Sequence, residues 1–420
     1  MKGGIRIGKI FGIPLHLDPS WFLIVGLMTF WFSAAYAKLS PNFSWAYGLL
    51  TALLLFLSVL LHELGHSLTA KAHGIEVTSI TLYPFGGTSS FDREFKSPWI
   101  LFSVSIAGPL VNLVLGILLT GLAWSIAGDG IFITTSPKTM DNLVANVGTL
   151  RTIWGFMVLN IAYINIILGV FNLIPGLPLD GGQVLKAAVW QITGDRTTGI
   201  RWAARSGQIL GIVAMLQGVL LIASQRLFDG FFLMLLGWFV MNQALRHLQI
   251  TNLQQALQEL TAEEAMTRDF RIVDADMTLR RFADEFLLME DKNAEPVYFA
   301  ASNGRDRGII LAEEIRHVDR SEWENKTLHS IVKPLPSIDS VELKTKIPSV
   351  INLLEEKKAR YLPVLSQVGS VAGIVDRGDV IRALSRKFNW KIPETYIQNI
   401  KKEGKFPPEL PLADIAAQIP

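Results

Sequence analysis

The 420-residue chain contains no cysteine, few histidines and few charged residues. The absence of cysteine excludes disulfide bonds, thiolate metal ligands and a cysteine nucleophile. Charged residues make up only 18% of the chain, the formal net charge is +2, and no basic cluster occurs, so the sequence predicts no nucleic-acid partner. Apolar residues are abundant instead and form half of the chain.

The apolar residues are concentrated before about residue 250. Six runs there approach the roughly 20 residues that a helix needs to cross a bilayer. They are residues 17–36, 46–68, 99–127, 153–174, 207–224 and 228–246, each to within a few residues. We therefore expect a polytopic, multi-pass α-helical membrane protein over residues 1–250. A soluble α/β part is expected over residues 260–387 and a loosely structured tail over residues 388–420.

Lysines and arginines near the ends of these runs predict how the bundle is oriented. Lys2, Arg6 and Lys9 precede the first run, and further basic residues lie between the second and third, between the fourth and fifth, and after the sixth. The opposite loops hold fewer, so both termini and the end of the second run are predicted to face the cytoplasm. A cleaved signal peptide is less favoured than a retained first helix, because no small-residue cleavage site follows early.

Two histidines and a glutamate lie at the end of the second apolar run, as His62-Glu63-Leu64-Gly65-His66. Histidines four residues apart share one face of a helix and can bind one zinc ion, while the glutamate reaches a water on the metal. Polar groups at the edge of a membrane span are unfavourable without a partner or a function. A hydrogen-bonded pair of helix-end histidines is the plainer alternative.

A catalytic zinc site also needs a third protein ligand and an open position for water. Asp180 fits, because it follows two prolines that break the fourth apolar run at the depth predicted for His62. Broken backbone at membrane depth is tolerated where it lines a polar cavity. His73 lies roughly 10 Å farther along the helix than His66 and cannot share the ion. Taken by itself, this segment would favour the alternative, an interfacial loop with a turn at Asp180-Gly181.

β-Branched and aromatic residues around Pro84 and Gly86-Gly87 predict a β-hairpin over residues 75–91, directly after the helix of the zinc motif. An exposed edge of this hairpin can add an extended peptide as another strand. A plain connection between two helices is the alternative.

Residues 260–387 contain an internal repeat. The stretch from Gly308 to Ile315 matches the stretch from Gly373 to Val380, with two apolar residues after each glycine and an acidic residue six positions after it. Before each stretch the pattern predicts a helix and then a strand. The helices are expected at about 278–289 and 346–358, and the strands at 295–298 and 361–364.

Three motifs together resemble the site-2 protease family of intramembrane zinc metalloproteases. They are the zinc motif itself, the element Gly108-Pro109-x-x-Asn112 in the third run, and Asn172-x-x-Pro175 followed by Leu179-Asp180-Gly181. The resemblance covers residues 1 to about 250, with the motifs in the family's order.

By this resemblance the two histidines of the motif and Asp180 hold zinc. Glu63 takes a proton from water and passes it to the leaving amine. Asn112 and Asn172 are candidates for stabilising the oxyanion, with hydrogen bonding between helices as the alternative for both. The implied substrate is a transmembrane segment of a membrane-anchored protein, such as a regulator, cleaved within the lipid bilayer. Such a helix must unwind before its peptide bond is accessible.

The repeat resembles a pair of CBS motifs, a regulatory module that often binds adenine nucleotides. The chain is therefore similar to the CBS-bearing branch of prokaryotic site-2 proteases. The resemblance places Asp379, and Glu314 in the first repeat, as acceptors for the ribose hydroxyls of an adenine nucleotide. The serine or threonine usual three residues earlier is Asp376 here and Leu311 in the first repeat, so neither repeat has the hydroxyl that the resemblance links to phosphate contact. A homodimerisation module is the alternative.

Two other functions fit parts of the sequence. A transporter or channel gated by the CBS pair predicts inverted repeats and carboxylates at mid-membrane, and the sequence shows neither. A non-catalytic zinc scaffold needs a fourth protein ligand, and no histidine or cysteine offers one. The three motifs therefore favour an intramembrane zinc metalloendopeptidase.

Overall fold

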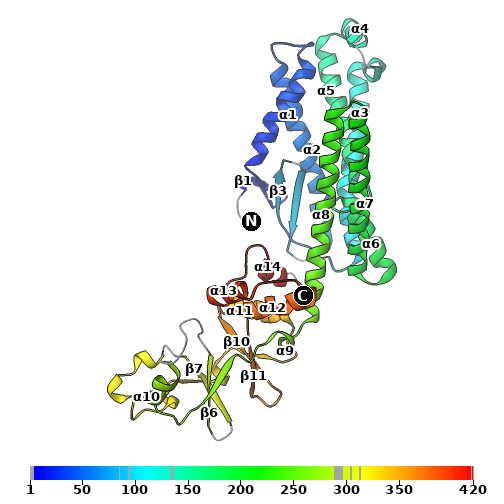
Figure 1. Cartoon of the computed structure of the whole chain (residues 1–420). Helices are drawn as coiled ribbons and strands as arrows, with labels where there is room; N and C mark the ends of the chain where they lie inside the picture. The colour runs from blue at the N-terminus through cyan, green and yellow to red at the C-terminus, as the bar shows by residue number, and fades with distance from the viewer. Residues whose placement is uncertain are drawn as a thin grey trace. The chain divides into compact units, whose positions relative to one another are not determined.

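The structure is a computed structural model that describes residues 4–84, 86–92, 95–133, 137–287, 297–302, 305–311, 314–417 and 419. It divides into two compact units, Met1–Thr251 and Asn252–Pro420 (Figure 1). Each unit has its own hydrophobic core.

Helices dominate the first unit. They are α1 Ser20–Tyr36, α2 Ser44–Ala72, α3 Pro98–Ala127, α4 Pro137–Val147, α5 Thr149–Asn172, α6 Asp180–Thr193, α7 Arg196–Ala223 and α8 Leu227–Glu259, which continues into the second unit. Each of the six expected membrane runs contributes a helix. Among the described residues, α2, α3, α5, α7 and α8 are long and apolar enough to cross a membrane, and α1 is a shorter apolar helix of 17 residues. The expectation of a multi-pass helical membrane protein is confirmed.

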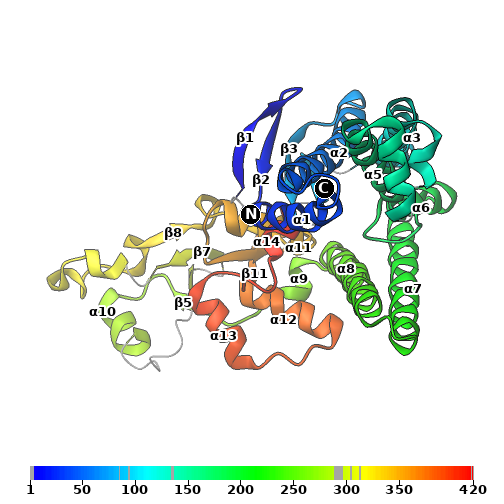
Figure 2. The same ribbon diagram turned by 90° about the horizontal axis from the view of Figure 1, so that it is seen from above.

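The helices of this unit pack closely at small residues. Figure 2 looks along the bundle and shows α2, α3 and α5 side by side, in agreement with their contacts. Between α7 and α8, a Cβ on Gly211 would lie 2.6 Å from the Gly237 carbonyl oxygen, and a Cβ on Gly218 would lie 2.7 Å from that of Gly230. Lipid provides no hydrophobic drive for helix association, so close packing of this kind holds membrane helices together.

A four-stranded sheet packs against the C-terminal half of α2. Its strands are β1 Ile5–Ile10, β2 Ile13–Leu17, β3 Val77–Tyr83 and β4 Gly86–Phe91, in that spatial order, with only β2 and β3 parallel. Leu15 and Ile80 from the sheet share a core with Leu64 of α2 and Val104 of α3. The hairpin expected over residues 75–91 is confirmed as β3 and β4, apart from Phe85, which lies outside the described residues. The two N-terminal strands were not expected.

The second unit contains two smaller sheets, ordered β5-β6-β7-β8 and β11-β10-β9. The first half comprises α9 Ala262–Ala265, β5 Phe270–Asp274, α10 Leu279–Phe282, β6 Val297–Ser302, β7 Arg305–Ile310 and β8 Val332–Pro334. The second half comprises β9 Val341–Glu342, α11 Ile347–Glu356, β10 Tyr361–Leu365, β11 Val371–Asp376 and α12 Arg377–Phe388. One-turn helices lie at Ala283–Leu287, Glu314–His317, Arg320–Glu322, Leu328–Ser330 and Leu335–Ser337, and a further one in the first unit at Asp129–Ile133.

The two halves follow the expected repeat unequally. In the second half α11, β10 and β11 lie where the pattern predicts them. In the first half α10 and the adjoining turn match the expected helix as far as residue 287, and β6 begins at Val297. Residues 288, 289, 295 and 296 of these two expected elements lie outside the described residues. The halves differ most after their last repeated strand. α12 follows β11, whereas the first described element after β7 is the one-turn helix Glu314–His317.

Residues 388–420 do not form a loose tail. They contain α13 Glu394–Glu403 and α14 Leu412–Ala417. Ile400, Leu412 and Ile415 from this segment are buried in the same core as Val350 and Leu354 of α11. The expectation of loose structure is wrong because the helices are short and several prolines separate them, so neither shows a long periodic pattern in the sequence.

Candidate metal centre

α2 presents two histidines on one of its faces. The helix runs without a break from Ser44 to Ala72, so His62 and His66 lie about one turn apart. Both histidines and the intervening Glu63 are buried, with 7–8% of their surface exposed. The Nε2 atoms of the two histidines are 3.0 Å apart.

Asp180, the first residue of α6, completes this cluster. Its Oδ2 atom lies 3.1 Å from His62 Nε2 and 3.3 Å from His66 Nε2. Among the described residues, these three form the one group of histidines and carboxylates close enough to share a metal ion. The structure thus brings together three residues that the sequence singled out. It separates His73 from them, since His73 Nε2 contacts Ser103 Oγ at 3.0 Å.

The turns before α6 explain how the Asp180 carboxylate reaches the histidines. α5 ends at Asn172, and residues 173–179 carry the chain to the start of α6. The Leu177 N–H donates to the Ala203 carbonyl oxygen of α7 at 3.0 Å, so the neighbouring helix satisfies part of the broken backbone. A Cβ on Gly181 would lie 2.3 Å from the Leu173 carbonyl oxygen, so only glycine lets α6 begin this close to the end of α5.

The hydrogen bond on the far side of His66 orients its ring. His66 Nδ1 lies 2.7 Å from the Val104 carbonyl oxygen, which can only accept, so Nδ1 carries the proton. The Nε2 lone pair of His66 therefore faces His62 and Asp180. Three electron-rich atoms at separations of 3.0–3.3 Å need a proton or a cation among them. Four-coordinate zinc with bonds of about 2.0–2.1 Å sets its ligand atoms about 3.3 Å apart, close to these separations.

α3 packs against the two histidines of the cluster. A Cβ on Gly108 would lie 2.3 Å from His66 Nε2 and 2.7 Å from His62 Nε2, so a larger residue would fill the space between the histidines. One turn farther along α3, Asn112 is 1% exposed and its Oδ1 has no hydrogen-bond partner among the described residues, as is also true of His62 Nδ1. Asn172 is half-buried at the end of α5 and makes no hydrogen bond to the histidines within the described part of the chain.

Glu63 is held by the sheet. Ser89 Oγ of β4 donates to Glu63 Oε2 at 2.7 Å, and Ser67 Oγ of α2 lies 3.0 Å from Ser89 Oγ. Sequence reasoning missed both serines and the Val104 carbonyl. The predicted hairpin was the one available signal, and it does not indicate which of its side chains faces the helix.

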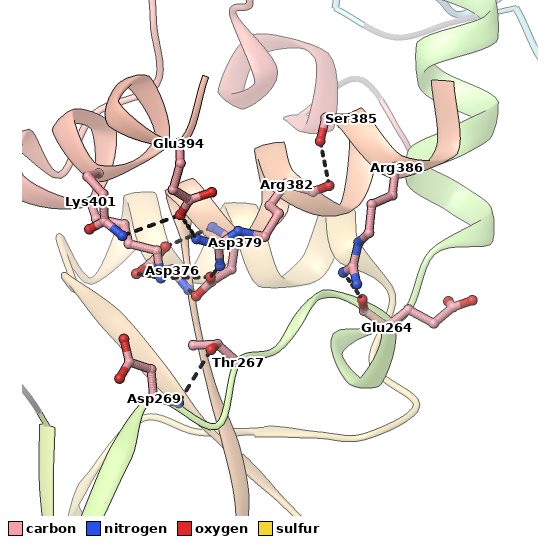
Figure 3. A network of polar contacts seen from close by, with 11 residues as sticks. Glu264, Thr267, Asp269, Asp376, Asp379, Arg382, Ser385, Arg386, Glu394 and Lys401 are labelled. Carbon is pink, nitrogen blue, oxygen red and sulfur yellow. Dashed lines mark hydrogen bonds and ion pairs between the residues drawn. The ribbon is translucent and has the colours of Figure 1, made fainter. Parts of the chain in front are cut away.

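A second polar cluster occurs in the other unit, around the predicted nucleotide residue Asp379 (Figure 3). Asp379 is fully buried near the start of α12. Its Oδ1 accepts from Lys401 Nζ of α13 at 2.7 Å and from Arg382 Nη1 at 2.8 Å. Lys401 also contacts Asp376 Oδ2 at 3.1 Å. Burial raises the pKa of the Asp379 carboxyl to about 6, the charge of Asp376 adds to this, and the two cations act in the opposite direction.

Glu314, the predicted counterpart of Asp379, has a different environment. It begins a one-turn helix, is partly exposed, and forms an ion pair with Lys333 at 3.2 Å. In the structure each of the two predicted nucleotide residues has a cationic partner, Lys401 and Arg382 for Asp379 and Lys333 for Glu314.

Comparisons with known proteins match both units. A model of peptidase family M50 matches residues 50–217, and a model of the CBS domain matches residues 331–386. A protein of Synechocystis sp. named as a zinc metalloprotease, sll0528, is 37% identical to this chain. The alignment covers 91% of this chain and 96% of that protein. Rip3 of Mycobacterium tuberculosis, named likewise, is 27% identical over 91% and 93% of the two lengths. Zinc metalloprotease MJ0392 of Methanocaldococcus jannaschii is 28% identical over 92% and 97%.

Proposed function

The chain belongs to peptidase family M50 as a zinc metalloprotease with a C-terminal CBS region, and we propose that it cleaves transmembrane segments of membrane-anchored proteins within the bilayer. The observation that carries this proposal is the convergence of His62, His66 and Asp180 beside Glu63, on helices in a bundle apolar enough to span a membrane. Membership of a protease family argues against the alternative function, a transporter or channel gated by the CBS pair.

His62, His66 and Asp180 would hold the zinc ion. The donor set of two imidazoles and one carboxylate is typical of catalytic zinc, and a fourth position remains for water. When bound, zinc lowers the pKa of water towards about 7 and polarises a peptide carbonyl. The Val104 carbonyl fixes the His66 tautomer that this binding requires.

Glu63 is proposed as the general base and then the general acid. Its carboxylate takes a proton from the attacking water and passes it to the leaving amine. Asn112 is proposed to donate a hydrogen bond to the developing oxyanion, because it is buried one turn from Gly108, which touches both histidines. Asn172 is the second candidate, at the end of the helix that leads to Asp180.

The substrate proposal rests on the sheet as well as on the helices. A transmembrane helix satisfies its own backbone and must unwind before hydrolysis, which leaves unpaired amides and carbonyls in lipid. β4 lies at one edge of the sheet and contacts Glu63 through Ser89. We propose that an unwound substrate pairs with this edge as an added strand.

We also propose that the metal centre and the CBS region face the cytoplasm, as the distribution of lysines and arginines predicts. The chain has no native cysteine, so single cysteines report on sidedness directly. Glu76→Cys, just after α2, should react with a membrane-impermeant maleimide from the cytoplasmic side of oriented vesicles. Asn142→Cys in α4 should react from the other side, and the reverse pattern would overturn the orientation.

An adenine nucleotide is the proposed regulatory ligand of the CBS region, which is also a candidate homodimer contact. Lys401 of α13 and Arg382 of α12 both pair with Asp379 Oδ1, so a ribose hydroxyl would compete with these two ion pairs for the carboxylate. Calorimetry of the full chain with ATP, AMP and adenosine tests this proposal. Heat with any of them supports nucleotide regulation, and no heat with all three leaves a structural or dimerisation module.

The decisive experiment on activity compares wild type with Glu63→Gln. Full-length proteins in liposomes are mixed with candidate single-span substrates, and new termini are mapped by mass spectrometry. Glu63→Gln should retain zinc and lose about 10²–10⁴-fold in turnover. Glu76→Gln, which changes an exposed glutamate outside the centre, is the matched control and should cleave normally. Normal turnover by Glu63→Gln would reject the proposed role of Glu63.

A further inference from the structure

We infer that Ser89 is a positioning residue for Glu63, through which the sheet orients the catalytic carboxylate. This inference rests on the proposed function, in which Glu63 is the base. The two are separable, because Glu63 can act as the base whether or not Ser89 positions it.

Proton counting assigns the direction of each hydrogen bond. The Ser89 hydroxyl has one proton and lies 2.7 Å from Glu63 Oε2, compared with 3.4 Å from the Glu63 carbonyl oxygen. A carboxylate can only accept, so this proton goes to Oε2. The Ser89 oxygen then accepts from Ser67 Oγ, which is fully buried 3.0 Å away. Oε2 therefore accepts from Ser89, and we assign Oε1 to receive the proton from water.

The backbone of β4 also touches Glu63. A Cβ on Gly87 would lie 2.4 Å from Glu63 Cγ, so the absence of a side chain at residue 87 lets the strand approach the glutamate. Gly87 and Ser89 are two residues apart and share one face of the strand. Thr88 and Ser90 on the other face are exposed. On the inner face of β4, the backbone at Gly87 thus packs against the Glu63 side chain, and Ser89 binds the Glu63 carboxylate.

This arrangement couples substrate docking to the base. β4 is the strand whose free edge is proposed to pair with the unwound substrate, and the same strand carries the donor to Glu63. Pairing would order β4 and with it the Ser89 hydroxyl. A carboxylate held in one orientation before reaction transfers its proton more efficiently than a mobile one.

Kinetics of three variants test the inference. Ser89→Ala should lower kcat by about 10-fold with KM and zinc content unchanged, because orientation of the base affects the chemical step and not docking. Ser89→Thr keeps a hydroxyl and should restore most of kcat. Ser103→Ala, which removes a serine hydroxyl bonded to His73 and Ile100, is the matched control.

A binding measurement provides a second readout that does not need turnover. A peptide hydroxamate binds zinc and also hydrogen-bonds the base carboxylate, so its Kd reports on Glu63. Ser89→Ala should weaken hydroxamate binding in the wild-type background and have no further effect in Glu63→Gln.

Three results would overturn the inference: wild-type kcat in Ser89→Ala, no recovery in Ser89→Thr, or equal weakening of the hydroxamate in both backgrounds. Each of these can occur while Glu63→Gln remains inactive, so the inference can fail without the proposed function. Normal turnover by Glu63→Gln would instead remove the premise of both.

Discussion

The protein has two polar clusters, one at the metal centre and one around Asp379. They differ in whether cationic side chains of the protein balance their carboxylates. At the metal centre, two imidazole nitrogens and the Asp180 carboxylate face one another, and no lysine or arginine of the described residues contacts Asp180. Around Asp379, two carboxylates face Lys401 and Arg382 at hydrogen-bonding distance. The first cluster needs a proton or a cation among its acceptor atoms, whereas lysine and arginine side chains of the protein neutralise the second.

The comparison teaches how to distinguish a binding site from a structural cluster. Buried charges are strongly unfavourable unless they are paired. A group of acceptors without a partner therefore indicates a ligand, whereas a group with matched partners indicates packing. By this criterion Asp379, the acidic residue that the CBS resemblance selected, has matched partners within the chain, with Lys401 of α13 and Arg382 of α12 on its carboxylate.

Removing Asp180 should have the largest effect on zinc binding and activity, because it takes one of the three proposed ligands from the metal centre. Asp180→Ala should lower zinc affinity by more than about 100-fold, the upper range for a residue that only supports a metal ligand. Proteolysis should fall in parallel. Metal analysis of purified protein after dialysis against a zinc buffer measures the first effect, and substrate cleavage measures the second. Full zinc occupancy in this variant would show that the centre has another ligand.

A proline in β4 tests whether the substrate pairs with the β4 edge of the sheet, beside the metal centre. Thr88 is exposed, and Thr88→Pro removes one backbone donor from the strand. Cleavage should fall by about 10- to 100-fold while zinc content stays near wild type, because misplaced substrate reacts slowly. Equal loss of zinc and of activity would mean that the strand is needed for folding and would remove the support for strand pairing.

Lys401→Met should remove one of the cations that neutralise the cluster around Asp379. Asp379 loses one of two cations, so its pKa rises further above the ordinary value of 3.8, and an ionised buried carboxylate then destabilises the folded state. A protonated Asp379 avoids this penalty below its folded pKa of about 6. The loss of stability should therefore be small at pH 5 and about 1–3 kcal/mol at pH 8. Hydrogen exchange of α12 and α13 in the full-length protein at both pH values measures it. Equal destabilisation at the two pH values would show that Lys401 acts through packing.

Glu314→Ala should have the smallest effect. Its ion pair with Lys333 is partly exposed, and such pairs contribute about 0–1 kcal/mol. Thermal unfolding of the full chain should be nearly unchanged, with Lys333→Ala as the companion variant. A loss comparable to that of Lys401→Met would show that the first repeat also depends on a structural ion pair.

Much of this architecture follows from local patterns in the chain. The apolar runs predicted the membrane helices, and the break at Pro175 and Pro178 predicted that α5 ends before Asp180. β1 and β2 were missed, since their residues adjoin the first apolar run and carry no turn signal as strong as that of the later hairpin. The helices after residue 388 were missed because short segments between prolines show little periodicity.

Residue spacing by itself determined that His62 and His66 share a helix face, because four residues make about one turn of any α-helix. It also marked Asp180 as a candidate, but not its distance from the histidines. Only the tertiary structure decided that Ser89 binds Glu63, that Val104 orients His66 and that Lys401 neutralises Asp379. Periodicity is a property of one segment of backbone, whereas these contacts depend on how separate segments pack against each other.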